Sequence, residues 1–177
     1  MNWITKIIKA GEKIKTAIRE RATKEDIAKS DWTSCCKGPI LKKDLENNLF
    51  VCASCNKHHY ISPTQRFDIM FGKNNWQKIE SPQPPPDPYN WQDTKKYTDR
   101  LKDAKKITGQ DNAILSCEAK INDIEVVVSA VNFKFIGGSI SMAEGENVLA
   151  SIQVAIDKKC PYIFISASGG MRMMTNM

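Results

Sequence analysis

The chain has 177 residues, a formal net charge of +6 and 26% charged residues, which is enough for one domain of ordinary size or for a small module joined to part of a larger one. Its sequence contains no apolar run close to the roughly 18 residues that a membrane-spanning helix needs. It also lacks the apolar core and cleavage site of a secretory signal. These features argue against an integral membrane protein, and we expect a cytoplasmic one.

The first thirty residues carry the most uneven charge. Residues 1–30 hold eight lysines and arginines against four acidic residues, a net charge of +4. Isoleucines recur between them at helical spacing, so residues 3–28 are predicted to form a basic amphipathic helix. Such a helix either docks on a partner or packs on its own domain. Its excess of positive charge suits nucleic acid, anionic lipid or a phosphate-rich ligand such as coenzyme A, or it is simply a solvated face.

Residues 31–60 contain a group of cysteines that predicts a small metal-binding module. Cys52 and Cys55 form a C-x-x-C turn, which brings two thiolates onto one tetrahedral metal, usually zinc. Cys35 and Cys36 are adjacent, so the other half of the site is irregular. The candidate ligands are therefore Cys35, Cys36, Cys52 and Cys55, with His58 as a possible substitute.

A disulfide framework and a set of buried apolar cysteines are the two alternatives to a zinc site in this module. Clustered cysteine pairs without an export signal favour a metal over a disulfide framework. The cysteines could also be small buried hydrophobes, but the segment between the pairs is too polar for a core to enclose it. Packing in the module is expected to come from Trp32, Leu45, Leu49 and Val51.

The remainder of the chain is predicted to be a connector followed by an α/β unit. We expect a helix from Ser62 to about Phe71, followed by a stiff proline-rich connector over residues 81–88. A second helix should run from Lys95 to about Thr108, and two strands, over 112–121 and 124–133, should be joined at a turn formed by Asn122-Asp123. A helix over 145–158 and a buried strand over 161–166 should follow. The helix over 145–158 should turn Val148, Leu149, Ile152, Ala155 and Ile156 to one face. The predicted domains are thus residues 1–30, 31–60, 61–94 and 95–177.

Two glycine pairs follow apolar segments. Gly137-Gly138 follows one strand, and the Ser168-Gly-Gly turn, containing Gly169 and Gly170, follows another and opens an apparent helix. Paired glycines leave backbone N–H groups bare and let a ligand oxygen approach closely, although either pair alone is also common as a plain turn. Neither pair has the lysine of a phosphate-cradling loop.

The histidines argue against a serine nucleophile beside these turns. The only two, His58 and His59, lie in the cysteine module, so the serines near the second turn have no predicted base. The chemistry expected here is stabilisation of an oxyanion by hydrogen bonds.

A series of motifs follows one pattern in one order. They are Trp32-Thr-Ser-Cys-Cys36, Asp44-Leu-Glu-Asn-Asn-Leu49, Val51-Cys-Ala-Ser-Cys-Asn-Lys-His58, Arg66-Phe-Asp68, Tyr97-Thr-Asp-Arg-Leu-Lys-Asp-Ala-Lys-Lys-Ile-Thr-Gly109, and the segments 133–141 and 161–173. Together they closely resemble the bacterial acetyl-coenzyme A carboxylase carboxyltransferase β subunit, from about Trp32 to Met174. The family continues with further strands and helices, so the resemblance implies an N-terminal portion of that subunit.

The resemblance implies a zinc ribbon in front of an incomplete crotonase-like (ββα superhelix) carboxyltransferase half-domain. It implies transfer of carboxylate from carboxybiotin, held on the biotin carboxyl carrier protein, to acetyl-coenzyme A, which gives malonyl-coenzyme A. The implied partners are an α subunit in an α2β2 complex and biotin carboxylase, and the implied cofactors are zinc and biotin. Gly169 and Gly170 would hold the thioester oxyanion, and Gly137 and Gly138 would line the coenzyme A side.

The chain departs from the family at its first cysteine pair. Counting back from Cys52 matches Cys36 to the family's second cysteine, so Cys35 falls two positions later than the family's first. An alternative from a different functional class is a ribbon that binds nucleic acid such as RNA through lysine–phosphate contacts. An inactive remnant is a further alternative.

Overall fold

The structure, a computed structural model, describes residues 31–35 and 38–175. It divides into two compact units, Met1–Tyr60 and Ile61–Met177. The helix predicted over residues 3–28 and the candidate ligand Cys36 lie outside the described residues.

The described part of the first unit is a hairpin followed by a short helix. Strands β1 (Trp32–Cys35) and β2 (Gly38–Leu41) pair antiparallel, and α3 (Lys42–Asn47) follows directly. Leu45 is buried as expected, but Trp32 and Leu49 are each more than half exposed, so the packing predicted for these two side chains is wrong. Helix α3 was not predicted, because its six residues are mostly polar and too few to show a periodic apolar pattern.

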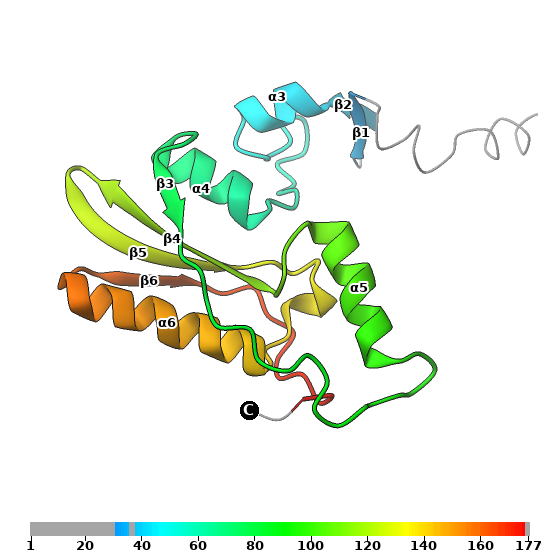
Figure 1. Ribbon diagram of the computed structural model, residues 1–177. Coiled ribbons are helices and arrows are strands. Elements are labelled where there is room, and N and C mark those ends of the chain that lie inside the picture. The colour runs from blue at the N-terminus through cyan, green and yellow to red at the C-terminus, as the bar shows by residue number, and fades with distance from the viewer. Residues whose placement is uncertain (1–30, 36–37, 176–177) are drawn as a thin grey trace, which may run out of the picture. The chain divides into compact units, whose positions relative to one another are not determined.

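The second unit is built on one mixed sheet (Figure 1). Its strands are β3 (Trp76–Lys78), β4 (Ile114–Ile121), β5 (Ile124–Val131) and β6 (Tyr162–Ile165). They are hydrogen-bonded in that order, with β6 parallel to β5 and the other pairs antiparallel. The predicted hairpin is confirmed: Asn122 and Asp123 form the turn with φ of 48° and 67°, the left-handed values that a two-residue hairpin turn requires.

Helices pack on both faces of this sheet. These are α4 (Pro63–Phe71) and α6 (Met142–Lys158), whereas α5 (Tyr97–Thr108) contacts the single 3₁₀ turn η1 (Ile136–Gly138). Successive side chains of β5 point to opposite faces of the sheet. Val126 and Val128 pack with Phe67 of α4 on one face, and Val127 packs with Ala155 of α6 on the other. Figure 1 shows α6 running along β5 and β6.

Helix α4 begins where the sequence predicts. Ser62 is its N-cap, with the Ser62 hydroxyl accepting from the Gln65 N–H at 3.2 Å and the Gln65 side chain accepting from the Ser62 N–H at 3.0 Å. Pro63 occupies the first helical turn, where its missing N–H costs nothing. The capping box fixes the start of α4. From this helix Phe67 packs over the sheet, with its ring edge-on to the ring of Trp76 in β3.

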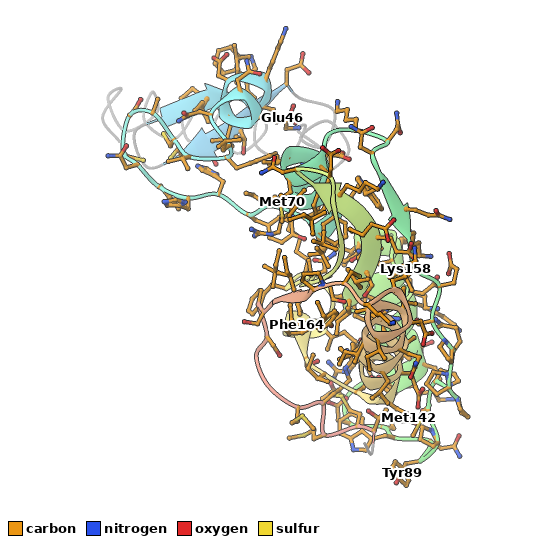
Figure 2. All side chains as sticks on the ribbon, turned by 90° about the vertical axis from the view of Figure 1, so that its left-hand side faces the viewer. Glu46, Met70, Tyr89, Met142, Lys158 and Phe164 are labelled. Atoms are coloured by element: carbon orange, nitrogen blue, oxygen red, sulfur yellow. The ribbon has the colours of Figure 1, made fainter. Side chains whose placement is uncertain are left out.

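Helix α6 buries a polar stripe, which differs from the apolar face predicted for it. Its buried side chains are Glu144, Asn147, Ser151 and Ala155. Leu149 and Ile156 are instead each 62% exposed (Figure 2 labels the helix ends, Met142 and Lys158). Of the apolar face predicted for this helix, Ala155 is buried as expected and packs with Val127, whereas Leu149 and Ile156 face outward.

Two further segments complete the unit. Between Lys78 and Tyr97 the described chain has no helix or strand, in keeping with the predicted proline-rich connector. After β6, residues 166–175 are also irregular, so the helix predicted to open at the Ser-Gly-Gly turn does not form within the described residues. No helix in the described part of the chain is long and apolar enough to cross a membrane.

Candidate functional site

The two glycine turns lie in direct backbone contact. Gly169 donates its N–H to the carbonyl of Gly137 at 2.9 Å. A Cβ on Gly138 would stand 2.2 Å from the carbonyl oxygen of Ala167, a distance that no side chain could tolerate. Gly138 also has a φ of +64°, so this position needs glycine both for space and for backbone conformation. The two pairs, some thirty residues apart in sequence, thus form one site.

A short parallel bridge extends this contact. The Ile140 N–H donates to the Gly170 carbonyl at 2.9 Å, and the Arg172 N–H donates to the Ile140 carbonyl at 2.7 Å. Ile140 directly precedes Ser141, the N-cap of α6. The chain after the second glycine turn is therefore fixed to the entrance of that helix.

The N–H groups of the second turn already have partners within the protein. Gly169 uses its N–H to join the two turns, so the oxyanion contact predicted for this N–H would require the bond to Gly137 to break. Gly170 donates to the Ser168 hydroxyl at 3.0 Å, and both residues are exposed. A side-chain hydroxyl at the surface can rotate away in favour of a ligand oxygen, whereas the backbone bond of Gly169 cannot be exchanged without separating the turns.

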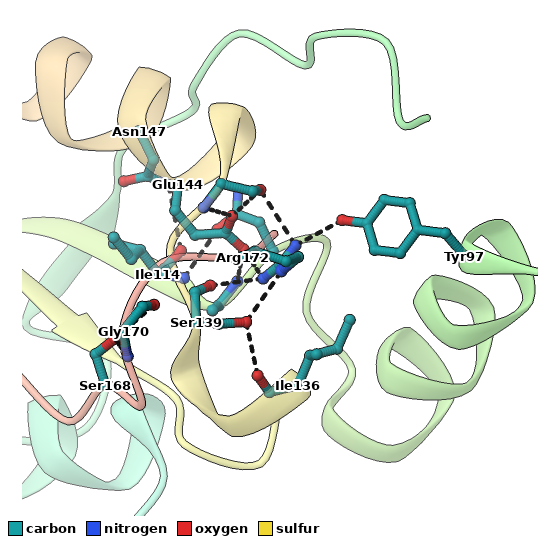
Figure 3. A network of polar contacts seen from close by, with 12 residues as sticks. Tyr97, Ile114, Ile136, Ser139, Glu144, Asn147, Ser168, Gly170 and Arg172 are labelled. Carbon is teal, nitrogen blue, oxygen red and sulfur yellow. Dashed lines mark hydrogen bonds and ion pairs between the residues drawn. The ribbon is translucent and has the colours of Figure 1, made fainter. Parts of the chain in front are cut away.

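A buried ion pair lies beside this turn (Figure 3). Arg172 donates from Nη2 to Oε1 of Glu144 at 2.9 Å, and the two side chains are 2% and 0% exposed. On the Ser139 side, Nε donates to the Ser139 hydroxyl at 3.0 Å and Nη2 donates to the Ser139 carbonyl at 2.6 Å. Nη1 donates to the Tyr97 hydroxyl at 2.9 Å and to the Ser141 hydroxyl at 3.1 Å. Each nitrogen of the guanidinium therefore has a partner.

The carboxylate of Glu144 is equally well satisfied. Its Oε1 also accepts from the Ala113 N–H at 2.8 Å, and its Oε2 accepts from the Ser141 N–H at 3.0 Å and from the Ser141 hydroxyl. Burial raises the pKa of the nearby Tyr97 hydroxyl, although its bond to Arg172 works in the opposite direction. The network joins α5, the start of β4, the start of α6 and the glycine turn, with no charge left unpaired.

The stripe on α6 continues this polar network along the sheet. Asn147 accepts from the Ser116 hydroxyl at 2.5 Å and donates to the Ile114 carbonyl at 3.2 Å, and the hydroxyls of Ser116 and Ser129 are 2.7 Å apart. Hydrogen bonds, and not apolar contacts, thus dock the first half of α6 on β4 and β5.

The first unit brings three of the candidate metal ligands together. The sulfur atoms of Cys35, Cys52 and Cys55 all lie within 4.8 Å of one another, and those of Cys35 and Cys55 are 3.3 Å apart. Zinc–sulfur bonds of about 2.3 Å in a tetrahedron place sulfurs about 3.8 Å apart, so the three thiols fit one zinc ion. None of the five described cysteines, which include Cys117 and Cys160, forms a disulfide.

A tight turn positions the C-x-x-C pair. The Asn56 N–H donates to the Cys52 carbonyl at 2.8 Å, and the Cys52 N–H donates to the Lys57 carbonyl at 2.9 Å. Asn56 has a φ of 57°, which asparagine tolerates better than most residues. These bonds point the Cys52 and Cys55 thiols toward Cys35.

The histidines of this unit differ from the sequence-based expectation. Nε2 of His59 lies 3.4 Å from the Cys35 sulfur, whereas His58, the substitute ligand predicted from sequence, is exposed and pairs with Val51 in an isolated bridge. The ligand atoms that lie within 4.8 Å of one another in the described residues are the three sulfurs alone, so His59 is placed to contact a ligand.

Comparison with known proteins agrees with the resemblance read from the motifs. No protein-family model matches the chain. The acetyl-coenzyme A carboxylase carboxyl transferase subunit beta of Pelagibacter ubique is 56% identical over 177 residues, which cover 100% of this chain and 57% of that protein. The chain is a homologue of this beta subunit. The corresponding subunit of Beijerinckia indica is 37% identical over 179 aligned positions, covering 60% of its length.

This carboxyl transferase homologue therefore spans somewhat more than half the length of the curated relatives it matches. The identity to the Pelagibacter ubique subunit extends over the whole chain, so the similarity covers both units. Among solved structures, the chain is similar to transcarboxylase 12S with a TM-score of 0.48 and 13% identity, over 65% of this chain and 20% of that one. It is also similar to the beta subunit of Pseudomonas aeruginosa geranyl-CoA carboxylase, with a TM-score of 0.44 and 18% identity, over 74% of this chain and 23% of that one.

Sequence reasoning missed the ion pair of Arg172 and Glu144. A signal for Glu144 was present, because Ser141 and Glu144 have the S-x-x-E spacing of a capping box. Arg172 lies among methionines with no periodic pattern, and its partner is 28 residues away, so nothing local indicates that its side chain is buried.

Proposed function

We propose that this chain contributes the N-terminal part of the carboxyltransferase β component of acetyl-coenzyme A carboxylase. In this role it would help to transfer carboxylate from carboxybiotin on the biotin carboxyl carrier protein to acetyl-coenzyme A, giving malonyl-coenzyme A. The partners would be a carboxyltransferase α subunit, in an α2β2 complex, and biotin carboxylase. The observation that carries the proposal is the 56% identity to a carboxyl transferase beta subunit over all 177 residues.

The proposed site for the thioester is the joined glycine turns. Loss of a proton from the acetyl methyl group produces an enolate oxygen, which needs hydrogen-bond donors already in place. Gly170 is the donor we assign first, because its N–H partner is an exposed serine hydroxyl that a ligand oxygen can replace. Gly169 would act chiefly by joining the turns, with Gly137 and Gly138 on the coenzyme A side of the contact.

We also propose that the first unit binds zinc in a ribbon. Cys35, Cys52 and Cys55 would supply three thiolates, and Cys36 remains the predicted fourth ligand. The His59 ring would donate its Nε2 hydrogen to the Cys35 sulfur, which would fix the orientation of that thiolate. Zinc supplies no chemistry to the carboxyl transfer in this proposal; it stabilises the fold of the unit.

The experiment that tests the proposed function is the reverse carboxyl exchange, in which labelled carboxylate passes from malonyl-coenzyme A to free biotin, leaving acetyl-coenzyme A and a carboxybiotin that loses CO2, using this chain with a carboxyltransferase α subunit. The proposal predicts biotin-dependent decarboxylation of malonyl-coenzyme A that requires both chains. Gly170→Pro removes the proposed donor and also forces a φ of +111° toward the roughly −65° of proline, so the rate should fall by at least the roughly 100-fold expected for one lost oxyanion donor. Gly109→Ala, at a positive-φ helix end outside the two turns, is the control for glycine replacement.

The nucleic-acid alternative remains a prediction from charge. Its test is RNA binding to the same preparation across a salt series. Binding that weakens steeply with salt, together with no biotin-dependent exchange, would favour that alternative and contradict the enzymatic one.

A further inference from the structure

Arg172 is fixed to the second glycine turn by both its backbone and its side chain. Its N–H donates to the Ile140 carbonyl, and the N–H of Ile140 donates to the carbonyl of Gly170. Its guanidinium reaches back to the carbonyl and the hydroxyl of Ser139, next to Ile140. Arg172 therefore braces the segment that holds the Gly170 carbonyl, while the Gly170 N–H lies in the preceding peptide plane, joined to it through the Gly170 Cα and directed at the Ser168 hydroxyl.

Glu144 is a rigid anchor for the Arg172 side chain. Glu144 lies in the first turn of α6 and is fully buried, and its two carboxylate oxygens accept from backbone N–H groups of Ala113 and Ser141. A carboxylate held in this way has no freedom to follow a moving arginine. Any displacement of the Arg172 side chain would leave a buried charge without its partner, which is strongly unfavourable.

The network is more than the fold alone would need. A buried ion pair is often no better for stability than apolar side chains of the same volume, so what this pair adds beyond apolar packing is directional contacts. The fork of a guanidinium supplies those contacts in one plane, and a lysine ammonium at the same place could not. The contacts of the guanidinium include the Ser139 carbonyl and hydroxyl (Figure 3), and Ile140, the next residue, donates its N–H to the Gly170 carbonyl.

We propose that Arg172, held by Glu144, is a positioning residue that fixes the direction of the Gly170 N–H for an oxyanion. The inference rests on the proposed function, because it assigns to Arg172 the role of orienting the Gly170 N–H before the thioester binds. Preorganisation of this kind matters because a donor that must reorient when charge develops loses much of its stabilising effect.

The test compares the affinities of two ligands for the full chain. One is coenzyme A itself, and the other is a coenzyme A thioether that carries a nitronate in place of the enolate. The variants are Arg172→Lys, which keeps the charge and loses the fork, and Glu144→Gln, which keeps the shape of the anchor. The matched control is Arg100→Lys, another ion-paired arginine, which bonds to Asp93.

We expect the wild-type chain and Arg100→Lys to bind the nitronate at least tenfold more tightly than coenzyme A. In Arg172→Lys and Glu144→Gln this preference should fall about tenfold, while the affinity for coenzyme A changes less than twofold. Hydrogen exchange at the Gly170 amide should accelerate at least tenfold more than exchange in β4 and β5 in the same variants, because loss of the pair also lowers the free energy of unfolding. This second measurement does not depend on any ligand.

Three results would overturn the inference. An unchanged preference and unchanged exchange at Gly170 in Arg172→Lys would show that the turn does not need the fork, and would leave the proposed function standing. A parallel loss of affinity for both ligands, together with equal acceleration of exchange at Gly170 and in the sheet, would show that Arg172 serves stability alone. No preference for the nitronate in the wild-type chain would reject the proposed oxyanion site, and the inference with it.

Discussion

The cysteine cluster of the first unit and the arginine–glutamate network of the second are both groups of ionisable side chains, but they are completed in different ways. In the network, the Arg172 nitrogens and the Glu144 oxygens all have partners within the protein. In the cluster, three thiols converge to within 4.8 Å of one another. Thiols gain little from such closeness unless a metal replaces their protons.

This difference has consequences for stability. The network is stabilised by the fold around it, so its free-energy contribution should be present whenever the second unit is folded. The cluster lies in a unit with few buried apolar side chains, Leu45 among them, and such units usually fold only with their metal. The two units should therefore respond oppositely to a chelator and to a mutation of the network.

Metal removal should give the largest effect. Treatment of the zinc-loaded chain with a chelator should abolish amide protection in residues 31–60, because structural zinc contributes on the order of 10 kcal/mol to the folding of small zinc modules. Protection in β4 and β5 should remain. Hydrogen exchange measured by mass spectrometry gives both readings from one sample.

The control for this experiment is the Cys52→Ser variant, which should behave like the chelated chain before any chelator is added. Zinc content measured by a colorimetric chelator should be one ion per wild-type chain. Full protection of residues 31–60 after zinc has been removed would contradict the proposed dependence on metal.

Breaking the buried ion pair should give the next largest effect. Arg172→Met leaves Glu144 buried without its cation, so the free energy of unfolding of the second unit should fall by about 3–5 kcal/mol. Urea denaturation followed by circular dichroism measures this change. Lys78→Met, which breaks the exposed pair with Glu80, should cost no more than about 1 kcal/mol. Equal losses in the two variants would show that burial of the pair carries no special weight.

Alkaline pH should weaken the second unit gradually, with a smaller change in each pH unit than the loss of the buried ion pair causes. Desolvation by burial raises the pKa of the Cys117 thiol from 9.0 to about 12, so the folded chain retains this proton after the unfolded chain has lost it. Stability should be fully present below about pH 9 and should fall by up to about 1.4 kcal/mol per pH unit between pH 9 and 12. The measurement is the midpoint of urea unfolding against pH, for the wild-type chain and for Cys117→Ala. The variant should lack the part of the slope that comes from this thiol, and identical slopes would contradict the assignment.

Local sequence signals predicted the parts of the fold that depend on neighbouring residues. Ser62-Pro63 marked the start of α4, Asn122-Asp123 marked the hairpin, and the C-x-x-C spacing marked two of the three clustered thiols. In each case the partners lie within a few residues, so spacing along the chain is also proximity in space. The same reasoning placed a glycine pair at each of the two turns, but not the contact between them.

Features that depend on distant partners were missed or misread. The predicted inward face of α6 ran through five apolar residues from Val148 to Ile156. Only Ala155 of these is fully buried, and the helix also docks through Glu144, Asn147 and Ser151. Each of these polar side chains is buried at little cost only because a partner is in place, and for Glu144 and Asn147 that partner lies far away in sequence. Apolar periodicity cannot reveal such a face.

The smallest expected effect, and the only stabilising one, comes from Gly145 on α6. This glycine lies one residue after Glu144, inside a helix, with a conformation that any residue can adopt and no atom within 4 Å of the position that an alanine methyl group would take. Gly145→Ala should therefore raise the free energy of unfolding by about 0.5–1 kcal/mol, mainly because alanine loses less backbone entropy on folding. Thermal unfolding of the full chain measures the change, and Gly138→Ala provides the opposite case, since its new methyl group would meet the Ala167 carbonyl at 2.2 Å. A destabilised Gly145→Ala variant would mean that the start of α6 needs more freedom than its hydrogen-bonded anchor suggests, and the rigid placement of Glu144 would then have to be reconsidered.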